Sequence, residues 1–269
     1  MNQRLMWAAV AVCLLPALAA GGCGGDGGAR EGKVAARATA PARPASPPAT
    51  AKPKPSPKPL PTRSVPRVDC ARVQCLALTF DDGPGEHTGR LLDMLRRYDA
   101  PSTFYVLGGS AKGEERLLRR MTAEGHEIGN HTYGHPNLVE LSSERIRSEI
   151  RRTQDVVRKA VGSAPRTMRP PYGSTDERVA KAVGMPQIFW RSDTRDWADR
   201  DANVVARRVL DIAAPGAVIL LHDTLGSSVD AMKKVLPELK RRGYRLVTVS
   251  QLRGTKPFKP GGVYYREWG

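Results

Sequence analysis

Two histidines four residues apart, His131 and His135, have the types and spacing to share one metal ion. Imidazoles at this separation can ligate the same ion when the segment between them makes a single helical turn. No glutamate follows His131, so the pair is not the HExxH motif of metalloproteases. Gly129, Gly134 and Pro136 predict a short turn here rather than a long helix.

Two adjacent acids, Asp81 and Asp82, precede Gly83-Pro84, a pair that predicts an immediate turn. Adjacent residues at a strand end project to different sides, so one carboxylate can bind metal while the other stays free as a base. Asp82 added to the two histidines gives two imidazoles and one carboxylate, a usual catalytic ligand set for zinc that also serves other divalent metals. A solvated turn is the alternative for such an acid pair.

Short apolar runs alternate with amphipathic stretches from Leu76 onward, which predicts strands and helices in turn. The predicted strands are residues 76–80, 103–107, 127–129, 167–169, 187–190, 217–221 and 245–249. The predicted helices are residues 88–98, 114–124, 142–161, 176–183, 203–213 and 228–242, with Ser142 or Ser143 as a cap and Gly243 as a stop. This alternation implies a parallel sheet with helices outside, and seven strands favour a barrel-like closure. No glycine-rich phosphate loop follows the first strand, which argues against a dinucleotide fold.

Polar and titratable residues follow five of the predicted strands. They are Asp81-Asp82, His131 with His135, residues 169–173, Asp193 with Asp196 and Trp197, and His222-Asp223. Because strand ends in parallel α/β folds point to one face, we expect these residues to form one site. A lone histidine beside an apolar run, such as His222, is more often a core or rim residue, but its place on this rim favours a role in the site. His87 and His126 are predicted to be structural or solvated.

These segments, taken in order, resemble the motifs of the polysaccharide deacetylases of the NodB-homology type, carbohydrate esterase family 4. The resemblance covers roughly Val68 to Gly254 and rests on residues 79–84, 131–135, 169–173, 193–197 and 220–223. No catalytic motif residue departs from the family pattern. The resemblance implies an α/β fold, a distorted (β/α)7 barrel, as a single catalytic domain.

The resemblance also implies roles for the residues around the metal. Asp82, His131 and His135 would bind the ion. Asp81 would be the general base that activates water, and Arg169 would pair with Asp81 and hold its orientation. Zinc is the expected metal by ligand type and availability, and cobalt, nickel and manganese fit the same ligands.

On the leaving-group side, the resemblance implies that His222 is the general acid that protonates the amine. Asp196 would orient His222 and favour its charged form, since a neighbouring carboxylate raises the pKa of an imidazole. The backbone N–H of Tyr172 would help to hold the oxyanion. Trp197 and Leu220 would line the pocket for the acetyl methyl group.

The implied partner is an acetylated glycan. The leading expectation is metal-dependent removal of N-acetyl groups from N-acetylglucosamine in peptidoglycan, with acetate released. A chitin or chitooligosaccharide deacetylase and an acetylxylan esterase are the alternatives, because loop residues set substrate choice. A non-catalytic wall-binding lipoprotein is a remote alternative, since it predicts a degraded set of motif residues.

The first 67 residues do not have the pattern of a folded domain. Residues 1–23 are predicted to be a signal peptide, with an apolar run, small residues and then Cys23 as a candidate lipidation site. Residues 24–67, rich in Pro, Ala and Lys, are predicted to be a disordered, extended linker. Residues 68–269 would then form the catalytic domain, exported and either lipid-anchored to the membrane or secreted.

The four cysteines fit an exported protein. Cys13 lies in the predicted signal and Cys23 would carry the lipid, which leaves Cys70 and Cys75 as a predicted disulfide.

The formal net charge of +16 is divided between the linker and the domain. Residues 29–67 hold nine Lys or Arg and one Glu, which accounts for +8 of it. A basic exported protein suits an anionic cell envelope. Nucleic-acid binding is the other usual interpretation of a basic chain, but export and the lack of a nucleic-acid motif argue against it.

Overall fold

A computed structural model describes residues 68–265 of the chain. The predicted signal peptide, Cys23 and the predicted linker at 24–67 lie outside the described residues, as do residues 266–269. No helix within 68–265 has both the length and the apolar character that crossing a bilayer requires.

The main sheet is parallel throughout and runs in the order β3-β2-β1-β6-β5. Its strands are β1 (Cys75–Asp81), β2 (Thr103–Val106), β3 (Glu127–Asn130), β5 (Ser192–Asp193) and β6 (Val218–His222), and β7 (Arg245–Leu246) pairs with the start of β1. In this register Asp81 at the end of β1 lies level with His222 at the end of β6. The pairing therefore brings two of the predicted site residues together at the carboxyl ends of neighbouring strands.

The remaining strands connect the two edges of this sheet. Strand β4 (Gln187–Ile188) pairs with β8 (Val263–Tyr264), and isolated bridges join Met168 to Asn130 and to Gln187. The chain from β4 to β5 thus pairs with Met168 at its start and with β6 at its end. The result is the predicted parallel α/β fold, closed as a distorted barrel.

Three strand predictions need correction. Residues 167–169 form only the bridges at Met168, because Pro170 directly after the segment has no N–H to extend a ladder. The predicted strand at 245–249 ends at Leu246, because Thr248 caps the short helix α9 (Val249–Arg253) with a reciprocal capping box. The predicted strand at 187–190 ends at Ile188 as β4, and β5 is a separate strand beyond the predicted range, so Asp193 lies within a strand.

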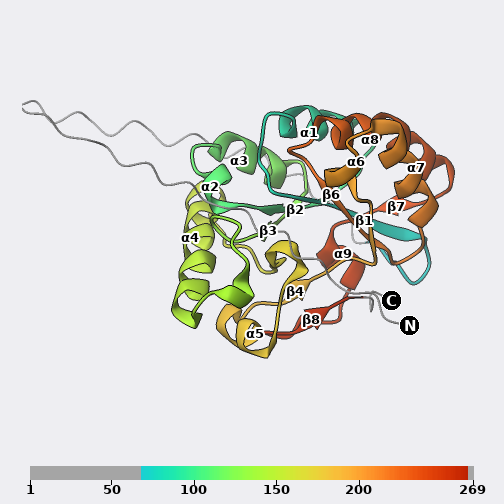
Figure 1. Cartoon of the computed structure of the whole chain (residues 1–269). Coiled ribbons are helices and arrows are strands. Elements are labelled where there is room, and N and C mark those ends of the chain that lie inside the picture. The colour runs from blue at the N-terminus through green and yellow to red at the C-terminus, as the bar shows by residue number, and fades with distance from the viewer. Residues whose placement is uncertain (1–67, 266–269) are drawn as a thin grey trace, which may run out of the picture. The chain divides into compact units, whose positions relative to one another are not determined.

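The six predicted helices are present, with bounds within two residues of the prediction. They are α1 (Thr88–Arg97), α3 (Glu115–Ala123), α4 (Ser143–Val161), α5 (Glu177–Val183), α7 (Ala202–Ile212) and α8 (Gly226–Arg241). Ser142 caps α4, and Gly243 follows the end of α8 with a φ of 83°. Three short α-helices of the described residues were not predicted: α2 (Gly108–Ala111), α6 (Asp196–Asp199) and α9. Figure 1 shows α1, α7 and α8 together on one side of the strands, with α4 on another.

Alternation along β1 divides its side chains between two layers. Leu76, Leu78 and Phe80 belong to the large apolar cluster under the outer helices, whereas Cys75 and Ala77 belong to a cluster inside the barrel. Since alternate residues face the same side, the next inward positions after Ala77 are Thr79 and Asp81. The apolar core therefore fixes the direction in which the catalytic candidates point.

The amino-terminal end of β1 is tied by a disulfide between Cys70 and Cys75, as predicted.

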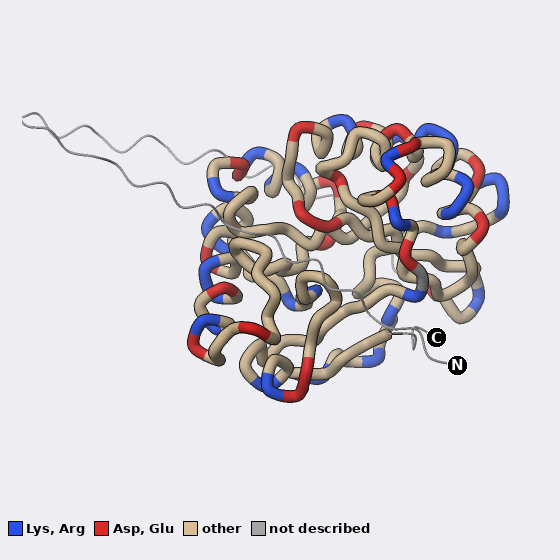
Figure 2. Tube along the Cα trace, in the orientation of Figure 1, with Lys and Arg blue, Asp and Glu red and all other residues tan. Residues whose placement is uncertain are grey.

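Basic and acidic residues are interspersed over the outer helices in the view of Figure 2, and the basic ones do not gather in one region there.

Candidate active site

Three side chains at the carboxyl ends of β1 and β3 form a group that could hold a metal ion: Asp82, His131 and His135. Asp82 Oδ1 lies 3.4 Å from Nε2 of each histidine. Two ligands about 2.1 Å from one ion at tetrahedral angles lie about 3.4 Å apart, so the spacing fits zinc-like coordination.

The donor atoms of this group are left free for such an ion. Asp82 Oδ1 is buried and has no hydrogen-bond partner among the described residues. His131 Nδ1 lies 2.7 Å from the carbonyl oxygen of Arg169, which requires the proton on Nδ1 and leaves the Nε2 lone pair available. Burial lowers the pKa of His131 to about 3, so the ring is neutral, as a ligand must be. The residues present therefore fit a divalent metal.

The histidine loop, residues 131–135, is a short bend rather than a helix, as predicted, and the backbone is unusual both here and at Asp82. Asp82, Thr132 and His135 have positive φ values of 71°, 71° and 59°. Residues other than glycine adopt this conformation rarely, and it recurs at functional sites.

On one side of the metal group, Asp81 is held by Arg169. Asp81 is 3 % exposed, and its Oδ1 accepts a 2.8 Å hydrogen bond from Arg169 Nη1. Arg169 is fully buried and also donates to Thr79 Oγ1 and to the carbonyl oxygen of Ile188. Burial raises the pKa of Asp81, opposed by the nearby guanidinium. The arrangement is a carboxylate of fixed orientation and increased basicity.

On the other side, His222 is held by Asp196. His222 Nδ1 and the His222 backbone N–H both lie 2.8 Å from the Asp196 carboxylate, which also accepts from Ser228 Oγ at 2.6 Å. Burial lowers the pKa of His222, but the hydrogen bond and the charge of Asp196 outweigh it and raise the value to about 9. The ring is therefore charged near neutral pH and can act as an acid.

Between these two pairs lies a cleft with a cavity of about 420 Å³. Leu220 is buried in its wall, whereas Tyr172 and Trp197 are 69 % and 52 % exposed beside it. Tyr172 has a φ of 59° and its ring contacts that of His135 at 4.6 Å between centroids. All the residues predicted for the metal, the base, the acid and the pocket are thus within or directly behind one cleft.

Several residues of the site were missed by sequence reasoning. Thr79 holds Arg169, Ser228 holds Asp196, and Trp190 lines the cleft. The inward position of Thr79 on β1, two residues before Asp81, was a usable signal, since alternate strand residues share a face. Ser228 comes from α8, and its contact with Asp196 depends on tertiary packing alone.

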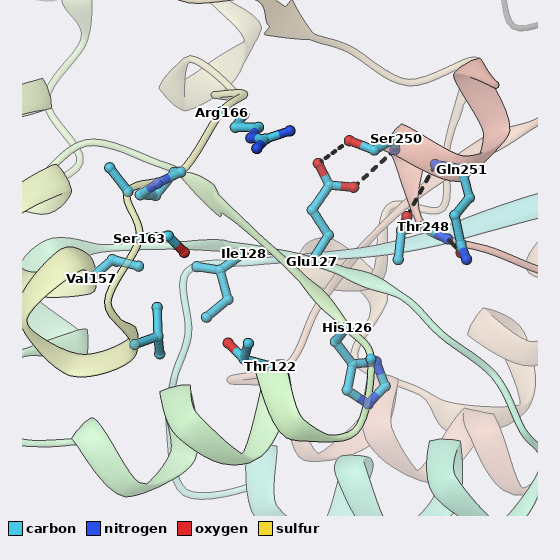
Figure 3. A pocket seen from close by; sticks show the side chains of 14 residues that line it. Thr122, His126, Glu127, Ile128, Val157, Ser163, Arg166, Thr248, Ser250 and Gln251 are labelled. Atoms are coloured by element: carbon cyan, nitrogen blue, oxygen red, sulfur yellow. Dashed lines mark hydrogen bonds between the residues drawn. The ribbon is translucent and has the colours of Figure 1, made fainter. Parts of the chain in front are cut away.

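The two remaining histidines lie outside the cleft. His126, just before β3, is buried, and its Nδ1 accepts from Ser102 N. It borders a second cavity, of about 290 Å³, at the amino-terminal end of the strands (Figure 3). His87 precedes α1. The prediction of a structural role agrees with the burial of His126.

Comparison with known proteins finds relatives that are similar in sequence and solved structures that are similar in fold. The family model described as polysaccharide deacetylase matches residues 69–188. The peptidoglycan-N-acetylglucosamine deacetylase PgdA of Listeria monocytogenes is 40 % identical over 194 residues, which are 71 % of this chain and 42 % of that protein. The peptidoglycan-N-acetylmuramic acid deacetylase PdaC of Bacillus subtilis is 40 % identical over 182 residues, 67 % of this chain and 39 % of that protein. The chain thus matches about two fifths of the length of each.

Among solved structures, the T48 deacetylase with substrate is similar over nearly its whole length. The identity is 43 %, the TM-score is 0.71, and the match covers 73 % of this chain and 99 % of that one.

Proposed function

This chain belongs to the polysaccharide deacetylase family of hydrolases, and we propose that it removes N-acetyl groups from N-acetylglucosamine residues of peptidoglycan. The reaction is hydrolytic: water adds to the acetyl carbonyl carbon, the carbon–nitrogen bond breaks, and acetate and a free amine are released.

One observation carries the proposal. The possible metal group lies between an oriented carboxylate, Asp81 on Arg169, and an oriented imidazole, His222 on Asp196. The carboxylate can accept a proton and the charged imidazole can give one, and hydrolysis of an amide needs both transfers. A merely structural ion pair needs neither a free ligand atom nor an open cleft.

Asp81 is proposed as the general base that takes a proton from the attacking water. Its Oδ1 is occupied by Arg169, which leaves Oδ2 directed toward the metal group, 3.8 Å from His131 Nε2. The guanidinium keeps the carboxylate in one orientation. A bound divalent ion at Asp82, His131 and His135 would polarise the acetyl carbonyl and lower the pKa of water.

His222 is proposed as the general acid that gives its Nε2 proton to the leaving nitrogen. An amine leaves poorly unless it is protonated, so a cationic imidazole opposite the base is required. Asp196 accepts from Nδ1, which directs the other ring nitrogen into the cleft. Tyr172 would donate its backbone N–H to the oxyanion, and Trp197 with Leu220 would contact the acetyl methyl group.

The choice of peptidoglycan is supported by the names of the relatives, which act on N-acetylglucosamine or on N-acetylmuramic acid. Export through residues 1–23 and a tether at Cys23 with the linker at 24–67 are part of the proposal, since they would bring the domain to the wall. Zinc is the proposed metal.

The experiment is incubation of the chain with purified peptidoglycan, followed by digestion to disaccharide fragments and mass spectrometry. Loss of 42 mass units from the N-acetylglucosamine moiety is the expected result. Loss from N-acetylmuramic acid would correct the sugar. Deacetylation of chitin oligomers or acetylxylan, with none of peptidoglycan, would contradict the substrate proposal.

A further inference from the structure

The histidine loop, residues 131–135, is held from outside the barrel by Glu149 on α4. Glu149 Oε2 accepts hydrogen bonds from two successive backbone amides, Tyr133 N at 2.9 Å and Gly134 N at 2.8 Å. The Glu149 side chain is only 16 % exposed, and the bond from Tyr133 N is partly buried, whereas Gly134 is exposed. A donor left unsatisfied where water is partly excluded is costly.

The loop needs such support because of its backbone. Thr132 and His135 have φ values of 71° and 59°, which persist only where the surroundings determine them. Thr132 N donates to Asn130 Oδ1 at 2.8 Å, and His135 N donates to Thr132 Oγ1 at 3.1 Å. Together with the two bonds to Glu149, every backbone N–H from Thr132 to His135 has a side-chain acceptor.

The carbonyl side of the loop is fixed by α2. Gly108 N donates to the carbonyl oxygen of Thr132, and Gly109 N donates to that of Tyr133, both at 2.9 Å. A Cβ on Gly108 would lie 2.7 Å from the Tyr133 ring, so only glycine allows this approach. The loop is therefore clamped between α2 and α4, two helices that carry none of the residues proposed for catalysis.

Arg152, one turn after Glu149 on α4, completes the clamp. Its Nη1 lies 3.5 Å from Glu149 Oε1, and its guanidinium lies 3.5 Å from the centroid of the Tyr133 ring. The contact covers Tyr133 and holds the carboxylate against the loop.

We propose that Glu149 is a positioning residue for the metal site. By binding the two amides between His131 and His135, it fixes the separation of the two imidazoles and so sets the affinity for the ion. Partners that orient metal ligands typically change affinity about 10–100-fold when removed. The inference rests on the metal site of the proposed function.

The test is titration of the metal-free full-length chain with Co²⁺, in which the visible absorption of the bound cobalt is measured at each addition. Glu149→Ala should weaken cobalt binding about 10–100-fold and alter the absorption bands that report ligand geometry. Glu149→Gln keeps an oxygen that can accept both amides and should restore most of the affinity. Glu144→Ala, on the same helix with a side chain 77 % exposed, is the matched control and should bind like the unmodified chain.

Unchanged cobalt affinity and spectrum in Glu149→Ala would overturn the inference while leaving the metal site intact. An equal loss in Glu149→Ala and Glu144→Ala, in step with lower thermal stability of the metal-free chains, would also overturn it, because the effect would then be a general one of α4. If the unmodified chain bound no cobalt, the proposed metal site itself would be wrong, and this would be evident before any variant is compared.

Discussion

The two ends of the barrel both gather carboxylates and imidazoles, yet they use them in opposite ways. At the carboxyl end, Asp82 Oδ1 has no hydrogen-bond partner among the described residues and lies 3.4 Å from Nε2 of both His131 and His135. At the amino end, Glu127 accepts from Ser250 N at 2.9 Å and from Ser250 Oγ at 2.8 Å (Figure 3). At the carboxyl end a free carboxylate oxygen faces two imidazoles, whereas at the amino end the Glu127 carboxylate is bound by the chain itself.

The cavity at the amino end shows that polar lining alone does not make a site. Its Glu127 contacts Thr103 Oγ1 as well as Ser250, so the carboxylate is occupied by the chain itself. His126 points away from Glu127 in Figure 3, and its Nδ1 is used by Ser102 N. What distinguishes the candidate active site is that a carboxylate oxygen without a hydrogen-bond partner among the described residues lies 3.4 Å from two imidazole nitrogens.

His126 at the amino end and His222 at the carboxyl end also differ in the direction in which their pKa values are shifted. Burial is the main influence on His126 and lowers its pKa to about 3. His222 is also buried, but Asp196 outweighs this and raises its pKa to about 9. Near pH 7 the His126 imidazole is therefore neutral, like that of the metal-site residue His131, whereas His222 is charged.

The largest expected effect is at the carboxyl end. Asp81→Asn removes the proposed base and should lower kcat for acetate release about 10²–10⁴-fold, the usual contribution of such a group. Arg169 keeps its bonds to Thr79 and to the carbonyl oxygen of Ile188, so we expect a folded variant. Circular dichroism and cobalt binding check the fold and the metal site. Full activity in a folded variant would exclude Asp81 as the base.

The next effect concerns the pH range of activity. An acid must be protonated, so activity that depends on His222 should fall as the pH rises through about 9. In Asp196→Asn the carboxylate charge is gone and burial dominates, so this basic limb should move to lower pH. The measurement is kcat against pH from 6 to 10, and an unmoved limb would contradict the role of Asp196.

At the amino end, stability rather than activity should depend on pH. The folded pKa of His126 is about 3 and the unfolded value about 6.5, so its contribution to stability is present above pH 6.5 and lost as the pH falls toward 3. Between pH 7 and 4.5 this amounts to about 2 kcal/mol. His126→Asn, which keeps an acceptor for Ser102 N, should reduce that loss in urea unfolding. An unchanged loss would show that other groups cause it.

The smallest effect is expected for Glu127→Gln. The amide keeps one acceptor for Ser250 but loses the other, which should lower the free energy of unfolding by about 1 kcal/mol. The value of kcat should not change, because Glu127 lies at the opposite end of the strands from the cleft. A large loss of activity without a loss of stability would mean that the two ends are coupled.

The sequence predicted the long elements well because their periodicity is strong. The failures were short pieces, and α2 and α6, four residues each, are examples with too little length to show a periodicity. The capping box from Thr248 to Gln251 was readable in the sequence and would have limited the last strand.

For the site, the ordered motifs identified the side chains that meet in the cleft. They could not indicate the complete burial of Arg169 or the positive φ of Tyr172, which arise from packing and turn geometry. Glu149 was missed for a similar reason. It stands on an outer helix with no motif, and only the tertiary structure brings it to the histidine loop.

The central claim, hydrolysis of peptidoglycan N-acetyl groups at the group of Asp82, His131 and His135, is tested most directly by acetate release from purified peptidoglycan. The chelator-treated chain is assayed before and after one equivalent of Zn²⁺ is added. We predict no release before the addition and restored release after it. Equal release without metal would contradict the claim.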